Sequence, residues 1–374
     1  MDFTLSPSQL SLQAAAAEAF GRWPPGDGPP PAESWAMLAA EGWLGIALPE
    51  SAGGAGLGLL EQVLVLEAAG CHLHSGYWPA VVLGALPLAR CGLVPAWYPD
   101  LAAGRRRVVL ALYEQADRFD PLAVTATATA VPEGYRLNGA KVLIPAAATA
   151  DAILFPARLG NRIALFAVPA GTGVLTPADF PDIARPHANL TLDCAQLPPE
   201  SLLAPDAETY LRTAVRIAGI GLCAELLGVA EAVLARTTAY AGERHQFGRP
   251  IGSFQAIKHR CADMKIALES ARSAIYYAAW AADQQTADAD LATSVAKVFC
   301  SQQMPDLVAH ALHIHGGLGF TWEARLHLYF RRTLAAAAYL GDVRWHRERI
   351  AQALLAGGAG RGIIDAADAA VAGG

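Results

Sequence analysis

The chain has 374 residues, of which 53% are hydrophobic and 17% are charged. This length and apolar content are enough for a large core spread over two or three packed modules. The net charge is −6, and the one basic triplet is Arg105 to Arg107. Nucleic-acid phosphates bind to a concentrated basic face, so we expect no nucleic-acid partner.

The cysteines and the apolar runs bear on the compartment. Six cysteines are scattered without a C-x-x-C pair, which is typical of reduced thiols in a cytoplasmic protein and not of disulfides or a zinc site. The first ten residues lack the basic-then-apolar order of a signal peptide. The apolar run 217–227 is interrupted by Gly219, Gly221 and Glu225, so we expect no membrane span and a cytoplasmic location.

Three regions of different texture follow one another. Residues 1–107 carry apolar residues at helical spacing. Residues 108–205 hold short apolar runs separated by turn residues, which predicts a small antiparallel β domain. Residues 206–374 return to long helices, and the proline-free stretches 208–242 and 254–283 predict two of them. We therefore expect an α+β chain of three domains. The expected strands lie near residues 124–130, 135–144, 153–155 and 163–168.

A polar cluster joins these two helices. Residues 244–255 read RHQFGRPIGSFQ, which gathers Arg244 and two glutamines beside a glycine-containing turn. Arginine donates two hydrogen bonds to phosphate oxygens, and a helix N-terminus adds backbone N–H groups. The cluster therefore suits a pyrophosphate or a purine edge. An ordinary helix–helix corner with polar surface residues is the alternative.

A second motif, residues 313–320, reads HIHGGLGF and places three glycines within four residues. Glycines let the backbone approach a ligand closely or adopt a positive φ. His313 and His315 are two positions apart with no adjacent acidic or cysteine partner, so we expect no metal site. A glycine-rich loop by itself is weak evidence of a ligand.

Together the two motifs resemble those of the acyl-CoA dehydrogenase family. The family's R-x-Q-F-G-x-P-I-x-x-F-Q string and its I-x-G-G-x-G-[FY]-x-x-E string, here residues 314–323, are separated by a helical stretch of the expected length. Residues 47–58, ALPESAGGAGLG, also resemble the family's N-terminal loop. The resemblance implies an N-terminal helical domain, a small β-barrel or sandwich domain, and a C-terminal four-helix bundle.

The same resemblance implies a cofactor, a reaction and partners. FAD lies between the β domain and the C-terminal helices, and a neighbouring subunit completes its ADP half. A homo-oligomer, dimer or tetramer, or a heterotetramer is therefore expected. A base removes the α-proton of an acyl-CoA, a β-hydride passes to the flavin, and an electron-transferring flavoprotein takes the electrons. The residues that match the family's positions around a neighbour's ADP are Arg244, Gln246, Phe247, Ile251, Phe254, Gln255, Gly316, Gly317 and His313, the last in place of the usual Gln.

The family's usual base is missing. Its Tyr-Glu-Gly-Thr string reads Tyr339-Leu340-Gly341-Asp342 here, although the backbone N–H of Leu340 can still polarise a thioester carbonyl. The slot used by a minority branch of the family falls near Ala218 and is also empty. Glu225, two helical turns further on, and Asp342 are the remaining candidates for a base. A solvated or capping carboxylate is the alternative for each.

The flavin-facing part of the β domain departs from the family as well. Where the family reads Thr-Glu-Pro-x-x-Gly-Ser, residues 112–118 read LYEQADR. The family's Trp-Ile-Thr string is Leu143-Ile144-Pro145, and proline has neither a hydroxyl nor an N–H for the flavin edge. The losses therefore fall on the ring-binding half, whereas the ADP-binding positions are kept.

Three functions stay open on this sequence. The first is an FAD-dependent acyl-CoA dehydrogenase that is active by itself with a non-standard base. The second is a catalytically silent partner subunit of a heterotetrameric enzyme of the kind that acts on CoA thioesters of steroid side chains. The third is a flavin oxidase or monooxygenase, since oxygen chemistry needs no α-proton abstraction.

Overall fold

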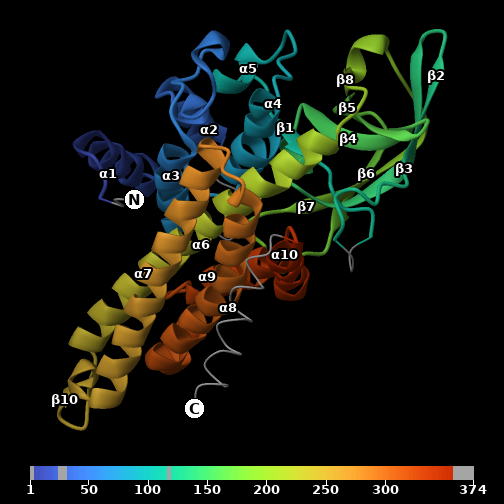
Figure 1. Ribbon diagram of the computed structural model, residues 1–374. Helices are drawn as coiled ribbons and strands as arrows, with labels where there is room; N and C mark the ends of the chain where they lie inside the picture. The colour runs from blue at the N-terminus through green and yellow to red at the C-terminus, as the bar shows by residue number, and fades with distance from the viewer. Residues whose placement is uncertain (1–3, 24–31, 116–118, 357–374) are drawn as a thin grey trace, which may run out of the picture.

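The computed structural model describes residues 4–23, 32–115 and 119–356. Figure 1 shows short helices at the top, a β domain at the upper right, and long helices that extend to the lower left. The N-terminal helices and the long helices share one apolar core, which one face of the sheet joins. A second apolar core lies within the β domain.

Short helices make up the N-terminal region. α1 begins at a capping box, in which the Ser6 hydroxyl accepts from the Gln9 backbone N–H at 3.2 Å and the Gln9 side chain accepts from the Ser6 N–H at 2.9 Å. α3 is buried along most of its length because it lies between α1 and the long helices. The elements are α1 (Pro7–Gly21), α2 (Ala32–Ala40), η1 (Trp43–Gly45), η2 (Glu50–Ala52), α3 (Leu59–Cys71), the π-helical η3 (Trp78–Ala85), α4 (Leu86–Arg90) and α5 (Pro99–Ala102).

A single sheet forms the β domain, with the strand order β6-β7-β3-β2-β4-β5-β8 and with β1 paired to β4. Most neighbours are antiparallel, as the sequence predicts, but the pairs β1–β4 and β2–β4 are parallel. The four expected strands correspond to β2, β3, β4 and β5. The strands are β1 (Val108–Leu110), β2 (Thr127–Val131), β3 (Gly134–Pro145), β4 (Ala152–Leu159), β5 (Arg162–Pro169), β6 (Val174–Ala178), β7 (His187–Leu197) and β8 (Leu202–Ala204), with the 3-10 turns η4 (Ala147–Thr149) and η5 (Pro199–Ser201).

Three long helices, α6, α7 and α8, and the shorter α9 form the C-terminal bundle, and α10 packs against α8. The two helices expected at 208–242 and 254–283 are α6 and α7, and each ends within one residue of its expected bounds. The division of the chain at residues 107 and 205 stays a prediction. The elements are α6 (Glu208–Glu243), β9 (His245–Gln246), β10 (Arg249–Pro250), η6 (Ile251–Ser253), α7 (Gln255–Asp283), α8 (Ala289–His315), η7 (Gly316–Phe320), α9 (Leu326–Ala338) and α10 (Val343–Ala356).

α6 is the central helix of the bundle. Within the described residues it is the one helix that by length and composition could cross a membrane, and 89% of its apolar window is buried inside the protein. Packing against α3, α7 and α8 therefore accounts for its apolar composition.

α3 and α6 cross with their backbones in contact. A Cβ on Gly228 of α6 would stand 1.9 Å from the carbonyl oxygen of Glu67, and a Cβ on Gly70 of α3 would stand 2.1 Å from the carbonyl oxygen of Glu225. Each helix therefore needs a glycine at the crossing. This close approach brings the Glu225 segment of α6 against the N-terminal region.

Candidate functional site

The two sequence motifs meet at the end of the bundle farthest from the β domain, here called the distal end. α7 and α8 are consecutive antiparallel helices, so the start of α7 at Gln255 lies beside the end of α8 at His315. The Tyr240 ring, near the end of α6, stacks on the His315 ring with centroids 4.4 Å apart. Figure 1 shows this end at the lower left, where β10 is labelled.

A two-stranded hairpin of β9 and β10 carries the first motif. Its turn residues Phe247 and Gly248 have φ angles of 53° and 77°, and the Phe247 side chain is 91% exposed. The Arg249 guanidinium carbon lies 4.1 Å from the centroid of the Phe254 ring. The Phe247 ring is thus open to contact with another molecule.

The other predicted residues of the distal end are open to a ligand. Gly316 has a φ of 61°, and no described atom lies within 4 Å of the place where a Cβ on Gly316 or Gly317 would stand. Open backbone beside arginine and glutamine side chains suits the phosphates of a nucleotide. The exposed members are Arg244, Gln246, Gln255 and His313, and the half-buried ones are Ile251 and Phe254.

The β domain lies at the opposite end of α6. β8 leads directly toward the start of α6, which then runs for 36 residues before the distal hairpin begins. At 1.5 Å per residue this helix is about 54 Å long. One chain therefore cannot bring its β domain and its own distal end to the same small ligand.

Leu340 stands in a closed turn after α9. It is fully buried with a φ of 61°, and its backbone N–H donates to the Tyr113 hydroxyl at 2.9 Å. Its carbonyl oxygen lies 3.0 Å from Nε2 of His346. The buried Lys297 ammonium donates to the last carbonyls of α9 and fixes the start of the turn. The N–H that the sequence offers to a thioester carbonyl is thus already bound to Tyr113.

The segment Leu143-Ile144-Pro145 is closed in the same way. The Leu143 N–H donates to the Asn189 side-chain oxygen at 3.0 Å, and its carbonyl oxygen accepts from the Tyr339 hydroxyl at 3.0 Å. The Tyr113 ring lies between, with its centroid 5.1 Å from those of both Phe119 and Tyr339. Aromatic side chains of this chain therefore fill the junction of the β domain and α9.

The helix position near Ala218 is covered by an indole. Trp78 of η3 donates from Nε1 to the Ala218 carbonyl oxygen at 3.1 Å. Its ring is 1% exposed and meets the Tyr339 ring edge-on, with centroids 6.0 Å apart. The space beside α6 at this level is therefore occupied by the Trp78 side chain.

Glu225 lies in a buried ion cluster. Its Oε1 accepts from Arg185 and, at 3.1 Å, from Arg332, while Arg332 also donates to Asp182. Each of the four side chains is at most 4% exposed. Two carboxylates balance two guanidinium groups, and the cluster joins the β domain, α6 and α9. These contacts favour a structural role for Glu225 over that of a base.

Asp342 is exposed and lies at the start of α10. Its Oδ1 accepts from the Trp345 backbone N–H at 2.8 Å, which is the contact of a helix N-cap. The capping role that the sequence left open for this carboxylate thus has a contact in the structure.

Neither metal nor disulfide chemistry finds a site among the described residues. They contain no group of three or more histidine, cysteine, aspartate or glutamate side chains that could hold a metal ion. All six cysteines are free thiols, as the sequence predicts.

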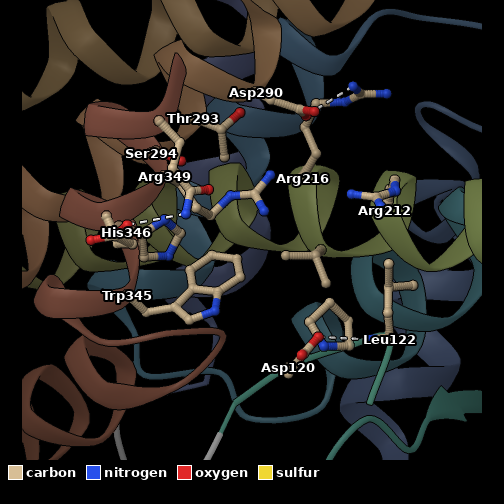
Figure 2. Close-up of a pocket in the computed structure, with 14 residues that line it drawn as sticks. Asp120, Leu122, Arg212, Arg216, Asp290, Thr293, Ser294, Trp345, His346 and Arg349 are labelled. Carbon is tan, nitrogen blue, oxygen red and sulfur yellow. Dashed lines mark hydrogen bonds and ion pairs between the residues drawn. The ribbon is translucent and has the colours of Figure 1, made fainter. Parts of the chain in front are cut away.

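A cavity of about 220 Å³ lies between α6, α8 and α10, and Figure 2 shows its walls, which carry three arginines and three carboxylates. Arg349 extends over the Trp345 ring, with its guanidinium carbon 4.7 Å from the ring centroid. Arg216 pairs with Asp290 at 3.0 Å, and Arg212 lies about one turn before Arg216 on α6. Sequence reasoning missed this site because its arginines come from two helices and form no short motif.

The buried histidines predict that the folded protein loses stability in acid. Burial lowers the pKa of His346 to about 3 and that of His187 to about 4, from an ordinary value of 6.5. Below about pH 6.5 these histidines therefore bind protons in the unfolded chain but not in the folded chain. The free energy of unfolding consequently falls as the pH drops toward 4. We expect His346→Gln to reduce this slope by about one proton, or about 1.4 kcal/mol per pH unit. Denaturation at several pH values measures it; the exposed His259→Gln is the control, and an unchanged slope would contradict the prediction.

Family models match both helical parts of the chain. Acyl-CoA dehydrogenase, N-terminal domain, matches residues 13–104, and acyl-CoA dehydrogenase, C-terminal domain, matches residues 209–355. The chain is 34% identical over 338 residues to the acyl-CoA dehydrogenase FadE27 of Mycobacterium tuberculosis, covering 86% of this chain and 88% of that protein. The chain belongs to the acyl-CoA dehydrogenase family.

Solved structures of the acyl-CoA dehydrogenase fold include two that are named for a pair of proteins. The steroid ACAD Tcur3481-Tcur3483 gives a TM-score of 0.84 at 31% identity, covering 95% of this chain and 100% of that chain. The ChsE4-ChsE5 complex from Mycobacterium tuberculosis gives 0.82 at 29% identity, covering 95% and 99%. The predicted order of helical, β and helical regions is confirmed by these likenesses.

FAD, the cofactor of the acyl-CoA dehydrogenase family, fits this chain at one end only. At the distal end, Arg244, Gln246 and the open backbone of Gly316 and Gly317 are free to hold an ADP moiety. At the β domain the residues do not fit, because the polar groups of Leu143 and Leu340 are bound within the chain and aromatic rings fill the space beside them.

Proposed function

We propose that this chain is the non-catalytic subunit of a mixed acyl-CoA dehydrogenase. Its distal end would supply the ADP half of a flavin site whose ring half and base belong to a partner chain. The observation that carries the proposal is the hydrogen bond from the Leu340 N–H to the Tyr113 hydroxyl, 2.9 Å long. The family's glutamate is absent, and the Leu340 N–H is the remaining group that the sequence offers to polarise a thioester carbonyl. The bond to Tyr113 occupies this N–H.

The chemistry of the reaction supports this division of labour. A thioester α-proton is weakly acidic, so its removal needs both a positioned base and a donor to the developing enolate oxygen. In this chain the two candidate bases are engaged elsewhere, Glu225 by two guanidinium groups and Asp342 by the N-terminus of α10. A chain that lacks both functions is suited to completing a neighbour's site and not to turnover by itself.

The likenesses support a partner that is a related chain. Two of the solved structures that this chain resembles are named as pairs, Tcur3481-Tcur3483 and ChsE4-ChsE5. One of them is named a steroid ACAD, so the substrate class that we propose for the mixed enzyme is a CoA thioester of a steroid side chain. An acyl-CoA and an electron-transferring flavoprotein would meet the partner's half of the assembly.

The visible absorption spectrum tests the proposal. The purified chain, alone and with added FAD, should show no stoichiometric flavin bands, and the chain co-expressed with a complete dehydrogenase subunit should be yellow. The yellow assembly should bleach anaerobically with an acyl-CoA. A yellow homo-oligomer that reduces its flavin with an acyl-CoA would overturn the proposal, and Glu225→Gln and Asp342→Asn would then locate the base.

Within the mixed assembly, the distal arginine has a predicted effect. Arg244→Ala should weaken flavin retention by at least tenfold, because a charge-assisted bond to a phosphate contributes about 1.5–3 kcal/mol. Flavin released on dilution and ultrafiltration measures it. Lys265→Ala is the matched control, since it removes an exposed cation from the same bundle, paired with Glu269 at 2.6 Å. Equal flavin loss in both variants would contradict a specific role for Arg244.

A further inference from the structure

A second cavity, of about 200 Å³, lies between the N-terminal region and the β domain. It is separate from the distal end and from the cavity of Figure 2, with which it shares no lining residue. Its walls come from α2, the segment before η3, the start of β1, the turn after β3 and the start of β7. The volume exceeds that of one water, which occupies about 30 Å³.

His74 is the group in this cavity that needs an explanation. Its side chain is 4% exposed, and neither ring nitrogen has a hydrogen-bond partner within the described chain. Burial, followed by the charges of Arg332, Arg185 and Arg107, lowers the pKa of His74 to about 3, so the ring is neutral. A neutral imidazole has one N–H donor and one acceptor, and leaving both buried and unpaired is costly.

Arginine side chains give the cavity a positive wall. The Arg107 guanidinium lies 4.4 Å from the centroid of the Trp35 ring, and no described carboxylate is within ion-pair distance of it. Asp151 accepts instead from the Arg107 backbone N–H, at 2.7 Å. Arg185, on the same wall, is already paired with Glu225. Arg107 is thus the cation that an incoming anion would meet.

The rest of the wall is mostly apolar. Trp35, Pro186 and Ala188 line it together with the alanines of the turn after β3. A phosphate would leave several oxygens facing these groups unpaired, whereas a carboxylate has two oxygens for one arginine and one imidazole. Ligand sites of this kind combine apolar walls with a few convergent polar groups.

We propose that this cavity binds a small organic carboxylate with an apolar body, such as a monocyclic or short-chain acid. The carboxylate lies between Arg107 and His74, which donates its N–H, and the apolar body lies against Trp35 and the alanines. The site is independent of the proposed flavin-completing role, because it uses none of the distal residues.

Benzoate is the probe, and titration calorimetry with the full chain measures its binding. Benzoate should bind the unaltered chain and raise its melting temperature with concentration, and benzyl alcohol should do neither. Arg107→Met should weaken benzoate binding about tenfold or more. Arg349→Met, which removes one of the three arginines of the cavity in Figure 2, should leave binding unchanged.

A second variant keeps the proposal testable if Arg107→Met does not fold. Ala148→Trp places a bulky ring at an exposed rim position of the cavity, and it too should weaken benzoate binding. Absence of benzoate binding to the unaltered chain would leave only water beside His74 and overturn the proposal. Binding that survives Arg107→Met and Ala148→Trp but is lost in Arg349→Met would assign the anion to the other cavity and would also overturn it.

Discussion

Replacing Arg332 with methionine is expected to lower the free energy of unfolding by about 3–5 kcal/mol. Arg332 is wholly buried and donates to both Asp182 and Glu225. Its removal leaves the Asp182 carboxylate buried without a cation. An unpaired buried charge lowers the free energy of unfolding by more than the ion pair had raised it. Chemical denaturation followed by circular dichroism measures the change.

The neighbouring arginine provides the control for this variant. Arg331 is exposed, so Arg331→Met should change the free energy of unfolding by no more than about 0.5 kcal/mol. Adding Asp182→Asn to Arg332→Met should restore part of the loss, because it removes the unpaired charge. Equal stability of Arg332→Met and Arg331→Met would show that the buried cluster does not hold the β domain, α6 and α9 together.

Gly228→Ala is expected to be strongly destabilising. The added Cβ would stand 1.9 Å from the carbonyl oxygen of Glu67, so α3 and α6 must move apart along a contact that both bury. Overpacking against fixed backbone costs typically 1–3 kcal/mol, and we expect about 3 kcal/mol or more here. Thermal unfolding and the yield of soluble protein measure it.

The same helix supplies the matched control. Gly242 lies in the last turn of α6, and no described atom is within 4 Å of its prospective Cβ. Gly242→Ala should therefore leave stability unchanged or raise it by up to about 1 kcal/mol, because alanine is the better helix former. If both alanines were tolerated equally, the close crossing of α3 and α6 would not be a requirement of the fold.

Local sequence patterns were sufficient for the long elements and for the distal end. The proline-free stretches predict α6 and α7 to within one residue, because helix ends depend on neighbouring residues. The strings at residues 244–255 and 313–320 also name the residues that the bundle brings together. The parallel pairs β1–β4 and β2–β4 were missed, because strand direction within a sheet depends on the path of the whole chain.

The closed ring half could be predicted only in part. The exchange of the family's glutamate for Leu340 is visible in the sequence, as is Tyr113 within the segment that departs from the family's Thr-Glu-Pro string. That the Tyr113 hydroxyl binds the Leu340 N–H is not visible, because the two residues are 227 positions apart. The partners of Glu225 were hidden for the same reason, since Arg332 is 107 positions away. Pairings over such separations follow from tertiary packing and carry no local signal.

The length of α6 also bears on how many flavins the proposed assembly can hold. Because the distal end and the β domain lie at opposite ends of this helix, two chains paired as proposed about a two-fold axis would form two equivalent places, each uniting one chain's distal end with the other's β domain. When this chain pairs with a complete relative, only one of the two places has an open ring half. Such a pair would carry one flavin per two polypeptides, and surplus synthesis of this chain would add no working site.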